Sequence, residues 1–355
     1  MLNDGSGEDH GVIKCKIDGE EIEVATLRID KTTDGRHAKI EYTKDWKLDA
    51  QRRDFTVNSL YLDLQSGEVF DYFNGLNHLK EKQIYFINDP AIRIQEDFLR
   101  IMRYFRFHAR IACNEGQHDQ KILNAIKKHC FGIESIAGER LWTELKLLFK
   151  IKNYSMVKDA LLQMNACGVL RHIGFPKNLN IVNFCNVCNH LHSNSNAHPM
   201  VFIASLINGN EDVAVLNFKF KFSIAEKNIL QFILQNRNII DSPNEGDTTE
   251  SLKDLLITTY AKSKKNKSST DKKENQNLQQ FYELLKYLGL CKLIGKFRSY
   301  DVPIIPLNGN DVMKMCGKKG PDVKKYLDEG GKIWRKSRYT ILKEDLVDQL
   351  MKLEL

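Results

Sequence analysis

Two polar stretches of the chain carry the residues best suited to bind a nucleotide. The first is DAQRRDFTVNSL (49–60), in which a pair of arginines precedes an aspartate and an asparagine. The second is IQEDFLRIMRYFRFHARI (94–111), in which an acidic pair precedes a series of arginines. Guanidinium groups bind phosphate oxygens, and carboxylate and amide groups can bond a ribose hydroxyl. For the first stretch, the alternative is a charged N-terminal turn of a helix.

The second stretch predicts one continuous helix over residues 94–111. At about 100° per residue, its apolar side chains fall within one arc and its charged side chains gather on the other side. Asp97 and Arg100, at positions i and i+3, then project from the same face. One interpretation of this pair is a surface ion pair worth roughly 0.2–0.5 kcal/mol.

The other interpretation is that Asp97 and Arg100 select a nucleobase. The carboxylate only accepts hydrogen bonds and the guanidinium only donates them. Cytosine and adenine both present an amino donor beside a ring-nitrogen acceptor, whereas uracil and guanine present the reverse order. The wrong base would leave buried polar groups unpaired, which is costly enough to give strong rejection. Such a pair would admit C and A, with Arg103 and Arg106 one and two turns away for phosphates.

The N-terminal part of the chain predicts strands. Residues 11–28 alternate and are rich in β-branched residues, and Asp18-Gly19 provides the turn of a hairpin. Residues 29–48 are polar and predict a mobile loop. A two-stranded hairpin is not independently stable, so we expect these strands to belong to a larger sheet.

From residue 49 onward the pattern becomes helical, apart from a strand-like GEVFDYF at 67–73. The segment 296–310 is rich in Pro and Gly and predicts a boundary before a small C-terminal unit. Helical runs are predicted at 90–111, 117–130, 138–150, 154–168, 200–207, 224–237, 278–295, 321–336 and 343–353.

Composition gives little support for nucleic-acid binding by itself. The net charge is +7, but the run 262–273 contains six Lys and one Asp, and so contributes +5 of it. We expect this run to be a solvated loop. No stretch reaches the roughly 18 apolar residues that a membrane span needs. Eight cysteines at irregular spacing, with no signal peptide or transit peptide evident, indicate reduced thiols inside a cell.

The stretch CNVCNHLHSNSNAH (185–198) raises the alternative of a zinc site. Two cysteines and two of its histidines could supply four tetrahedral ligands, but a finger-length segment and a second CxxC are missing. Apolar residues between 181 and 191 recur at helical spacing, which favours an amphipathic helix. The candidate ligands are Cys185, Cys188, His190, His192 and His198.

Several motifs occur together in the order and spacing of a known family. They are RRDFTVNSL (52–60), DYFNGLNHLK (71–80), RIQEDFLRIMRYFRF (93–107) and GERLWTEL (138–145), and residues 10–46 also look like the eukaryotic members. The chain resembles class II CCA-adding enzymes, which are tRNA nucleotidyltransferases of the polymerase-β superfamily. The resemblance implies an α+β protein, with the remnant of a polymerase-β-like sheet followed by an all-α neck, body and tail. The implied divisions are head 1–73, neck 74–165, body 166–298 and tail 299–355.

The resemblance also implies roles for individual residues. The motif that holds the ribose and phosphates matches Arg52, Arg53, Asp54 and Asn58. The amino-acid template that pairs with incoming CTP or ATP matches Glu96, Asp97 and Arg100, with Arg103 and Arg106 on the triphosphate. The hinge matches Asp71, Gly75 and Leu79, and the neck support matches Gly138, Glu139 and Arg140. The flexible loop matches residues 28–50, including Arg28, Asp34, Gly35 and Arg36, and the tail that contacts tRNA matches 307–327.

The metal-binding motif of the family has no counterpart in this sequence. The family holds two Mg²⁺ ions on an Asp-x-Asp pair that follows a Gly-Gly-x-Val-Arg-Asp stretch. These 355 residues contain no Asp-x-Asp, and the only Gly-Gly is Gly330-Gly331. Glu23 is a candidate accessory carboxylate, with a solvent-facing strand residue as the alternative. We expect an N-terminally truncated product with no complete catalytic or metal site.

Three functional hypotheses remain open at this stage. The first is an enzyme, or its fragment, that adds or repairs the CCA 3′ end of tRNA with CTP and ATP and needs Mg²⁺. The second is a catalytically inactive module that binds tRNA or nucleotide, and the third is a poly(A) polymerase of the same superfamily. The expected partners are tRNA, CTP and ATP, without a membrane, and the expected location is the cytoplasm, mitochondria or nucleus.

Overall fold

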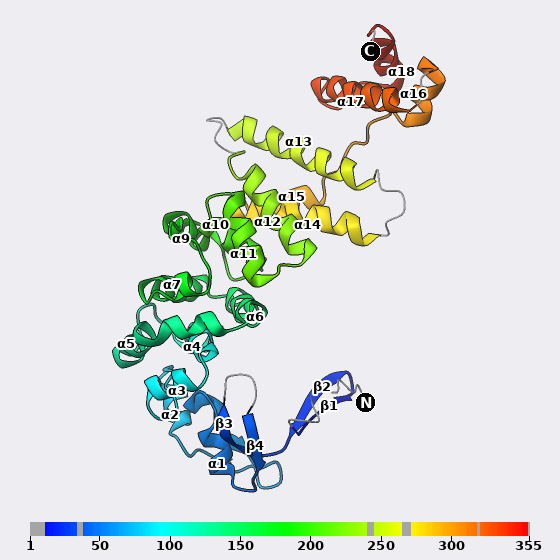
Figure 1. Cartoon of the computed structure of the whole chain (residues 1–355). Helices are drawn as coiled ribbons and strands as arrows, with labels where there is room; N and C mark the ends of the chain where they lie inside the picture. Colours follow the sequence, from blue (N-terminus) through cyan, green and yellow to red (C-terminus); the bar gives the residue numbers. More distant parts are fainter. Residues whose placement is uncertain (1–10, 34–37, 240–244, 265–270, 318–319, 354–355) are drawn as a thin grey trace. The chain divides into compact units, whose positions relative to one another are not determined.

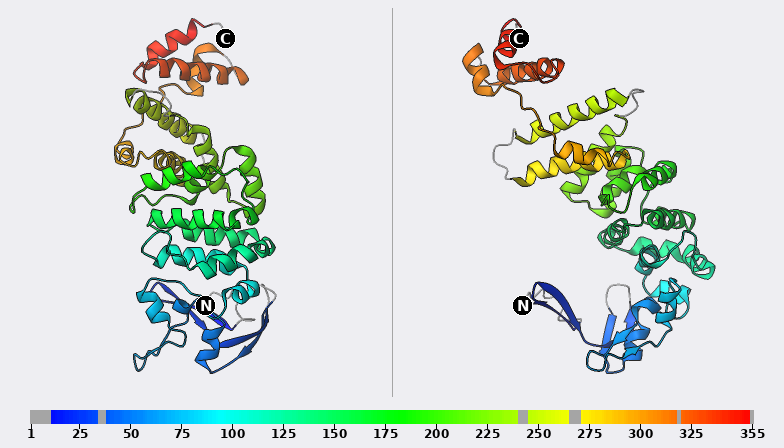
Figure 2. Two further views of the ribbon diagram at one scale, coloured as in Figure 1. Left: turned by 90° about the vertical axis from the view of Figure 1, so that its left-hand side faces the viewer. Right: turned by 180° about the vertical axis from the view of Figure 1, so that it is seen from behind.

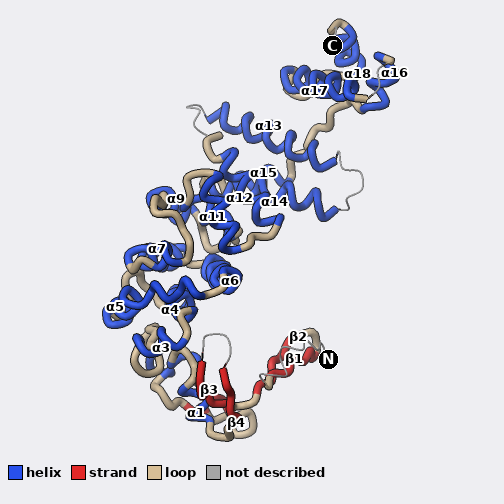
Figure 3. The backbone as a smooth tube through the Cα atoms, in the orientation of Figure 1, coloured by secondary structure: helices blue, strands red, loops and turns tan. Residues whose placement is uncertain are grey.

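The computed structural model of the chain describes residues 11–33, 38–239, 245–264, 271–317 and 320–353. It divides into two compact units, Met1–Leu230 and Gln231–Leu355, which are considered separately (Figure 1). The described strands all lie in the first unit and precede the long helical part of the chain (Figure 3). The predicted α+β class, with strands first and helices after them, is confirmed.

The first unit contains three short strand pairs and most of the helices. Each pair is a separate two-stranded antiparallel sheet: β1 with β2, β3 with β4, and β5 with β6. In chain order the elements are β1 (Val12–Ile17), β2 (Glu20–Ala25), β3 (Arg28–Thr33), β4 (Ala38–Tyr42), α1 (Trp46–Gln51), η2 (Thr56–Asn58), β5 (Tyr61–Leu62), β6 (Val69–Phe70), α2 (Gly75–Lys80), α3 (Pro90–Glu96), α4 (Leu99–Ile111), α5 (Gln120–His129), η3 (Cys130–Ser135), α6 (Gly138–Phe149), α7 (Tyr154–Ala166), α8 (Val169–His172), α9 (Ile181–His190), α10 (Pro199–Leu206), α11 (Asn210–Phe220) and α12 (Ile224–Asn236), the last of which crosses the boundary between the units.

The hairpin predicted over residues 11–28 is confirmed by strands β1 and β2. Ile17 lies opposite Glu20, which leaves Asp18 and Gly19 as a two-residue turn. Both turn residues have positive φ, 50° and 89°, as a type I′ turn requires. The local turn chemistry therefore determined this register.

The mobile loop predicted over residues 29–48 is wrong for its described part. Strands β3 and β4 pair there, with Arg28 opposite Tyr42, and helix α1 begins at Trp46. The backbone N–H of Arg28 donates to the Asp49 carboxylate at 3.0 Å and so ties β3 to α1.

The single helix predicted over residues 94–111 is also wrong, because the chain breaks at Asp97. Helix α3 ends at Glu96, Asp97 is extended (φ −152°, ψ 105°), and α4 begins at Leu99. The Asp97 carboxylate accepts a hydrogen bond from the backbone N–H of Leu99 at 3.0 Å. This bond satisfies an N–H at the start of α4 that would otherwise lack a partner.

The helices after residue 90 pack side by side and bury the aromatic core of the first unit. Helix α4 packs against α6 and α7, and α7 in turn packs against α9, which contacts α10 (Figure 2, cyan to green). Tyr104 and Phe105 of α4 are fully buried, and Phe149 stacks on Phe202 with ring centroids 4.8 Å apart. The amphipathic helix expected in place of a zinc site is confirmed by α9, in which Cys188 is buried.

The second unit is helical throughout its described residues. It contains two separate apolar clusters, one around Phe281 and Phe297 and one around Tyr326 and Leu350. Its helices are α13 (Glu245–Lys264), α14 (Asp271–Tyr287), α15 (Leu293–Arg298), α16 (Gly309–Cys316), α17 (Pro321–Lys336) and α18 (Lys343–Met351). The division into head, neck, body and tail remains a prediction.

Two predictions for the second unit need correction. The helix expected over 278–295 ends at Tyr287, because Gly289 takes φ 74° and the N–H of Leu290 returns to the carbonyl of Leu285, which terminates the helix. The loop expected over 262–273 is helical at both ends, and residues 265–270 lie outside the described part. In the ranges that the structure covers, no helix is both long and apolar enough to span a membrane.

We predict that Gly75→Ala destabilises the first unit. Gly75 begins α2, and a Cβ added there would lie 2.3 Å from the carbonyl oxygen of Thr56. Because that oxygen belongs to the backbone, the clash requires a shift of α2 or η2, at a cost of about 1–3 kcal/mol. Urea unfolding followed by circular dichroism measures the change.

The control for this substitution is Gly295→Ala inside α15, where an added Cβ meets nothing within 4 Å. Its effect is expected to be neutral or stabilising by up to about 1 kcal/mol, since alanine favours a helix. Equal stability of Gly75→Ala and the unaltered chain would show that α2 does not depend on this close approach.

Candidate functional site

One cavity of ≈ 470 Å³ in the first unit brings together both of the stretches singled out by the sequence. One wall comes from the segment that follows α1, and the other comes from the junction of α3 and α4 and the first turns of α4. This volume lies within the range of small-molecule sites. The lining residues are Arg53, Asp54, Asn58, Asp97, Arg100, Arg103 and Phe107.

The Asp54 carboxylate connects the two walls of the cavity. One of its oxygens accepts from the Nε of Arg103 at 2.6 Å, and the other accepts from the side-chain amide of Asn58 at 3.0 Å. The guanidinium of Arg103 also lies over the ring of Phe107, 5.4 Å from its centroid. Arg103 is therefore fixed at the cavity wall by an ion pair and a cation–π contact.

Asp49 is a site residue that was missed from the sequence. It is fully buried, and its carboxylate accepts from Arg52 Nε at 2.8 Å, from Arg53 Nη2 at 3.2 Å and from the hydroxyl of Tyr61. Asp49 stands three and four residues before the two arginines, and this i, i+3/i+4 spacing is the signal that could have identified it. Arg53 lines the cavity, whereas Arg52 does not.

The contacts around Asp49 shift the pKa values of Asp49, Tyr61 and Arg53. Burial opposes the charge of Asp49, but hydrogen bonds from Tyr61, the Arg28 backbone and Arg52 outweigh it and lower its pKa. Burial and the bond to Asp49 raise the pKa of Tyr61 to about 12. The pKa of Arg53 is raised because its contacts with Tyr61 and Asp49 outweigh burial. At neutral pH this cluster contains a carboxylate, two guanidinium groups and a neutral phenol.

Asp97 and Arg100 both line the cavity but do not pair with each other. The Nη1 of Arg100 donates to Glu96 at 2.7 Å and to the carbonyl of Arg93 at 2.9 Å, and its Nη2 donates to the carbonyl of Arg52 at 3.3 Å. One Asp97 oxygen accepts from the N–H of Leu99. The surface ion pair, one of the two interpretations above, is therefore absent between these two described residues.

Arg106 is the arginine whose placement differs most from the prediction. Its Nε donates to Glu144 of α6 at 2.5 Å, its side chain is buried, and it does not line the cavity. The guanidinium of Arg106 also lies over the ring of Phe107, 4.3 Å from its centroid. The same Glu144 lies 3.7 Å from Arg103. Glu144, which the sequence reasoning missed, thus does not line the cavity but holds Arg106 and contacts the cavity-lining Arg103.

The predicted hinge and neck-support residues make contacts inside the first unit. The Asp71 carboxylate accepts from the backbone N–H groups of Gly75 at 2.8 Å and Leu76 at 2.9 Å, and these bonds outweigh burial and lower its pKa. Arg140 of α6 approaches Asp97 at 3.9 Å, whereas Glu139 pairs with Lys221 at 2.7 Å.

The remaining predicted residues lie elsewhere or outside the described part. Glu23 on β2 is 63% exposed and pairs with Lys14 across the hairpin at 3.1 Å. Arg28 contacts Asp49 through its backbone and does not line the cavity. Asp34, Gly35 and Arg36 lie outside the described residues.

Comparison with known proteins shows which class of protein the chain and its fold resemble. Residues 2–85 match the family model for the poly A polymerase head domain, which indicates a nucleotidyltransferase. The fold of the whole chain is similar to the crystal structure of Bacillus stearothermophilus CCA-adding enzyme in complex with CTP. That match has a TM-score of 0.70 and 20% identity, and covers 99% of this chain and 83% of the other.

Curated relatives narrow the class to a family. The chain is 38% identical over 353 residues to CCA tRNA nucleotidyltransferase 1, mitochondrial, of Mus musculus, and 36% identical to the protein of the same name from Homo sapiens. Each match covers 99% of this chain and 77% of the relative. The chain therefore belongs to the CCA tRNA nucleotidyltransferases, a family of transferases.

We predict that Glu144→Gln destabilises the first unit strongly. The substitution keeps the shape of the side chain but leaves the buried guanidinium of Arg106 without its carboxylate. Removing one partner of a buried pair costs about 3–5 kcal/mol. Thermal and urea unfolding measure this change.

Glu139→Gln on the same helix is the matched control. Its pair with Lys221 is exposed on both sides, 53% for Glu139 and 69% for Lys221, so the expected cost is about 0–1 kcal/mol. Similar losses for the two variants would contradict a supporting role for Glu144.

Proposed function

We propose that this protein acts in the addition or repair of the CCA 3′ end of tRNA, and that its cavity binds and selects CTP and ATP. One observation carries the proposal: Asp97 and Arg100 share a single cavity with Arg53, Asn58 and Arg103. The cavity thus combines a candidate base-pairing surface with cations suited to phosphates and an amide suited to a ribose hydroxyl. Solved structures of similar fold are complexes with CTP and with ATP, which agrees with this assignment.

The donor count of Arg100 supports base selection by this residue. A guanidinium has five N–H donors, and three of those of Arg100 are used by Glu96 and two backbone carbonyls. Two donors are left for the ring nitrogen of cytosine or adenine. The second oxygen of Asp97 accepts no hydrogen bond from the described residues and lies 3.9 Å from Arg140, so it could accept from the amino group of either base. Uracil and guanine would present a donor to the guanidinium and an acceptor to the carboxylate.

We predict that Arg100→Ala or Asp97→Ala relaxes the choice among the four nucleoside triphosphates. The 355-residue chain should bind CTP and ATP more tightly than UTP and GTP in equilibrium dialysis. Each variant should lose most of this preference, because a mismatched base no longer leaves a buried group unpaired. The CTP-to-UTP affinity ratio is the quantity to compare.

Arg110→Ala is the control for the loss of a charge from the same helix, since Arg110 is exposed in the last turn of α4 and does not line the cavity. It should leave the affinity ratio unchanged. Unaltered rejection of UTP and GTP by Arg100→Ala and Asp97→Ala would eliminate the pair as the base-selecting group.

The described residues do not fit the Mg²⁺ ions expected for nucleotidyl transfer. The sequence contains no Asp-x-Asp pair, and the candidate carboxylate Glu23 is exposed and paired with Lys14. Among the described residues, only one group of three side chains is arranged to hold a metal, and two of the three are histidines. This group lies on α4, on α7 and on the segment between α4 and α5. We therefore propose that these residues select the nucleotide without joining it to the RNA.

We predict that the purified 355-residue chain adds no labelled CTP or ATP to a tRNA transcript lacking its CCA end, with or without Mg²⁺. Binding of CTP by the same preparation is the control for correct folding. Robust CCA addition by this chain would overturn the proposed division between selection and transfer.

The nature of any product would separate the two candidate activities. On a transcript ending in CC, one added A supports CCA completion, whereas a long A tract supports poly(A) synthesis. Binding of tRNA without addition supports a module that only binds tRNA or nucleotide. The vertebrate relatives carry mitochondrial names, and we propose mitochondria among the locations of this protein.

A further inference from the structure

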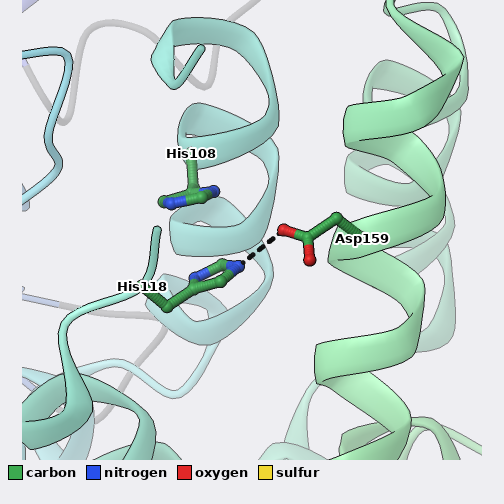
Figure 4. Close-up of side chains that lie close together, drawn as sticks. All are labelled: His108, His118 and Asp159. Carbon is green, nitrogen blue, oxygen red and sulfur yellow. Dashed lines mark hydrogen bonds and ion pairs between the residues drawn. The ribbon is translucent and has the colours of Figure 1, made fainter. Parts of the chain in front are cut away.

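A cluster of two histidines and an aspartate lies inside the first unit, apart from the residues that line the cavity. His108 belongs to the last turns of α4, His118 to the segment between α4 and α5, and Asp159 to α7 (Figure 4). One ligand atom from each of the three lies within 4.8 Å of the others. The cluster is buried: His108 is 2% exposed, and the side chains of His118 and Asp159 are 1% and 7% exposed.

One ring nitrogen of His108 has no hydrogen-bond partner among the described residues. Its Nε2 lies 2.9 Å from the carbonyl oxygen of Gln117, and a carbonyl only accepts, so this nitrogen carries the proton. The Nδ1 then has a free lone pair, is buried, and makes no hydrogen bond. A neutral imidazole with a free lone pair is the form that binds metals.

The other two residues are oriented by partners outside the cluster. The hydroxyl of Tyr104 lies 3.0 Å from Nδ1 of His118, and the backbone N–H of Gly116 donates to one oxygen of Asp159 at 3.1 Å. The Nε2 of His118 and the second oxygen of Asp159 therefore face each other, 3.0 Å apart (Figure 4). Such outer partners, which fix the orientation of each ligand, are typical of metal sites in proteins.

We infer that His108, His118 and Asp159 form a binding site for a divalent transition-metal ion of the Zn²⁺ type. Two imidazoles and one carboxylate are a donor set that zinc accepts, and the carboxylate offsets part of the charge of the ion. An all-oxygen set would instead favour Mg²⁺ or Ca²⁺. The site is therefore distinct in chemistry from the Mg²⁺ chemistry of nucleotidyl transfer.

Ion binding requires one local rearrangement. The rings of His108 and His118 are stacked, with centroids 3.6 Å apart and planes inclined by 15°. A bound ion lies in the plane of each imidazole that holds it, so the rings must tilt out of the stack. His118 lies between two helices rather than in one, and the segment 112–119 can shift more easily than α4 or α7. The shared ion replaces the bond between His118 and Asp159, and the proton of His118 then resides on Nδ1, which faces the Tyr104 hydroxyl.

An ion at this position would join three parts of the first unit. Helix α4 carries Arg100, Arg103 and Phe107 of the cavity and, at the next residue, His108. Linking His108 to Asp159 of α7 would fix the C-terminal turns of α4 in place. Any ligand that binds only the folded state raises stability by mass action. The inferred role is therefore structural, and it holds whether or not the cavity binds nucleotides.

The test uses the full 355-residue chain, dialysed against a chelator and titrated with Zn²⁺ by calorimetry and with Co²⁺ by visible absorption. We expect one equivalent of either metal to bind, with a rise in melting temperature and a Co²⁺ spectrum typical of nitrogen and oxygen ligands. His108→Gln removes the free nitrogen, together with the hydrogen bond of His108 to the carbonyl of Gln117. This variant should no longer bind the metal. Tyr104→Phe keeps the ligands but removes an outer partner, and should weaken binding about 10–100-fold.

His172→Gln is the control, because His172 pairs with Glu134 away from the cluster. It should bind metal as the unaltered chain does. Absence of stoichiometric binding by the unaltered chain would overturn the inference. So would binding that His108→Gln retains in full, or a Co²⁺ spectrum with thiolate charge-transfer bands, which would assign the ion to cysteine.

Discussion

The cavity between the two polar stretches depends on one buried arginine that joins them. The guanidinium of Arg93, 7% exposed, donates from Nη2 to the carbonyl oxygens of Arg52 and Arg53 at 2.7 and 2.5 Å, and from Nη1 to Glu96. A buried cation is costly unless its donors are satisfied, so α3 is stable only where these carbonyls meet it. Because Arg53 lines the cavity and Arg52 directly precedes it, these bonds position this segment against α3.

The break at Asp97 has a second consequence for the same cavity. In an unbroken helix, Asp97 and Arg100 would lie on one face at i and i+3 and would tend to pair with each other. The extended residue instead turns the Asp97 carboxylate toward the start of α4, and Arg100 pairs with Glu96. Both side chains thus line the cavity without pairing with each other.

Sequence reasoning was most accurate where local chemistry decides the structure, and least accurate where burial decides it. The Asp18-Gly19 turn predicted its hairpin. The motif resemblance named six of the seven residues that line the cavity, all except Phe107. Helical periodicity could not reveal the break at Asp97, because the apolar spacing continues through residues 94–111. The break depends on one capping hydrogen bond, from the N–H of Leu99 to the Asp97 carboxylate. Helical periodicity also placed Arg106 with the other arginines, although the carboxylate of Glu144, 38 residues away, draws it into the core.

Each arginine of the cavity is held by a carboxylate before any ligand arrives. Arg53 is bound by Asp49, Arg100 by Glu96 and Arg103 by Asp54. The pairs reduce the positive charge that a triphosphate would meet, so the cavity does not attract anions by charge alone. The pairs also immobilise three long arginine side chains when the protein folds. Because their rotamer entropy is already lost at that stage, it does not oppose the binding of a ligand. The remaining donors of these arginines therefore have fixed directions before a ligand reaches the cavity.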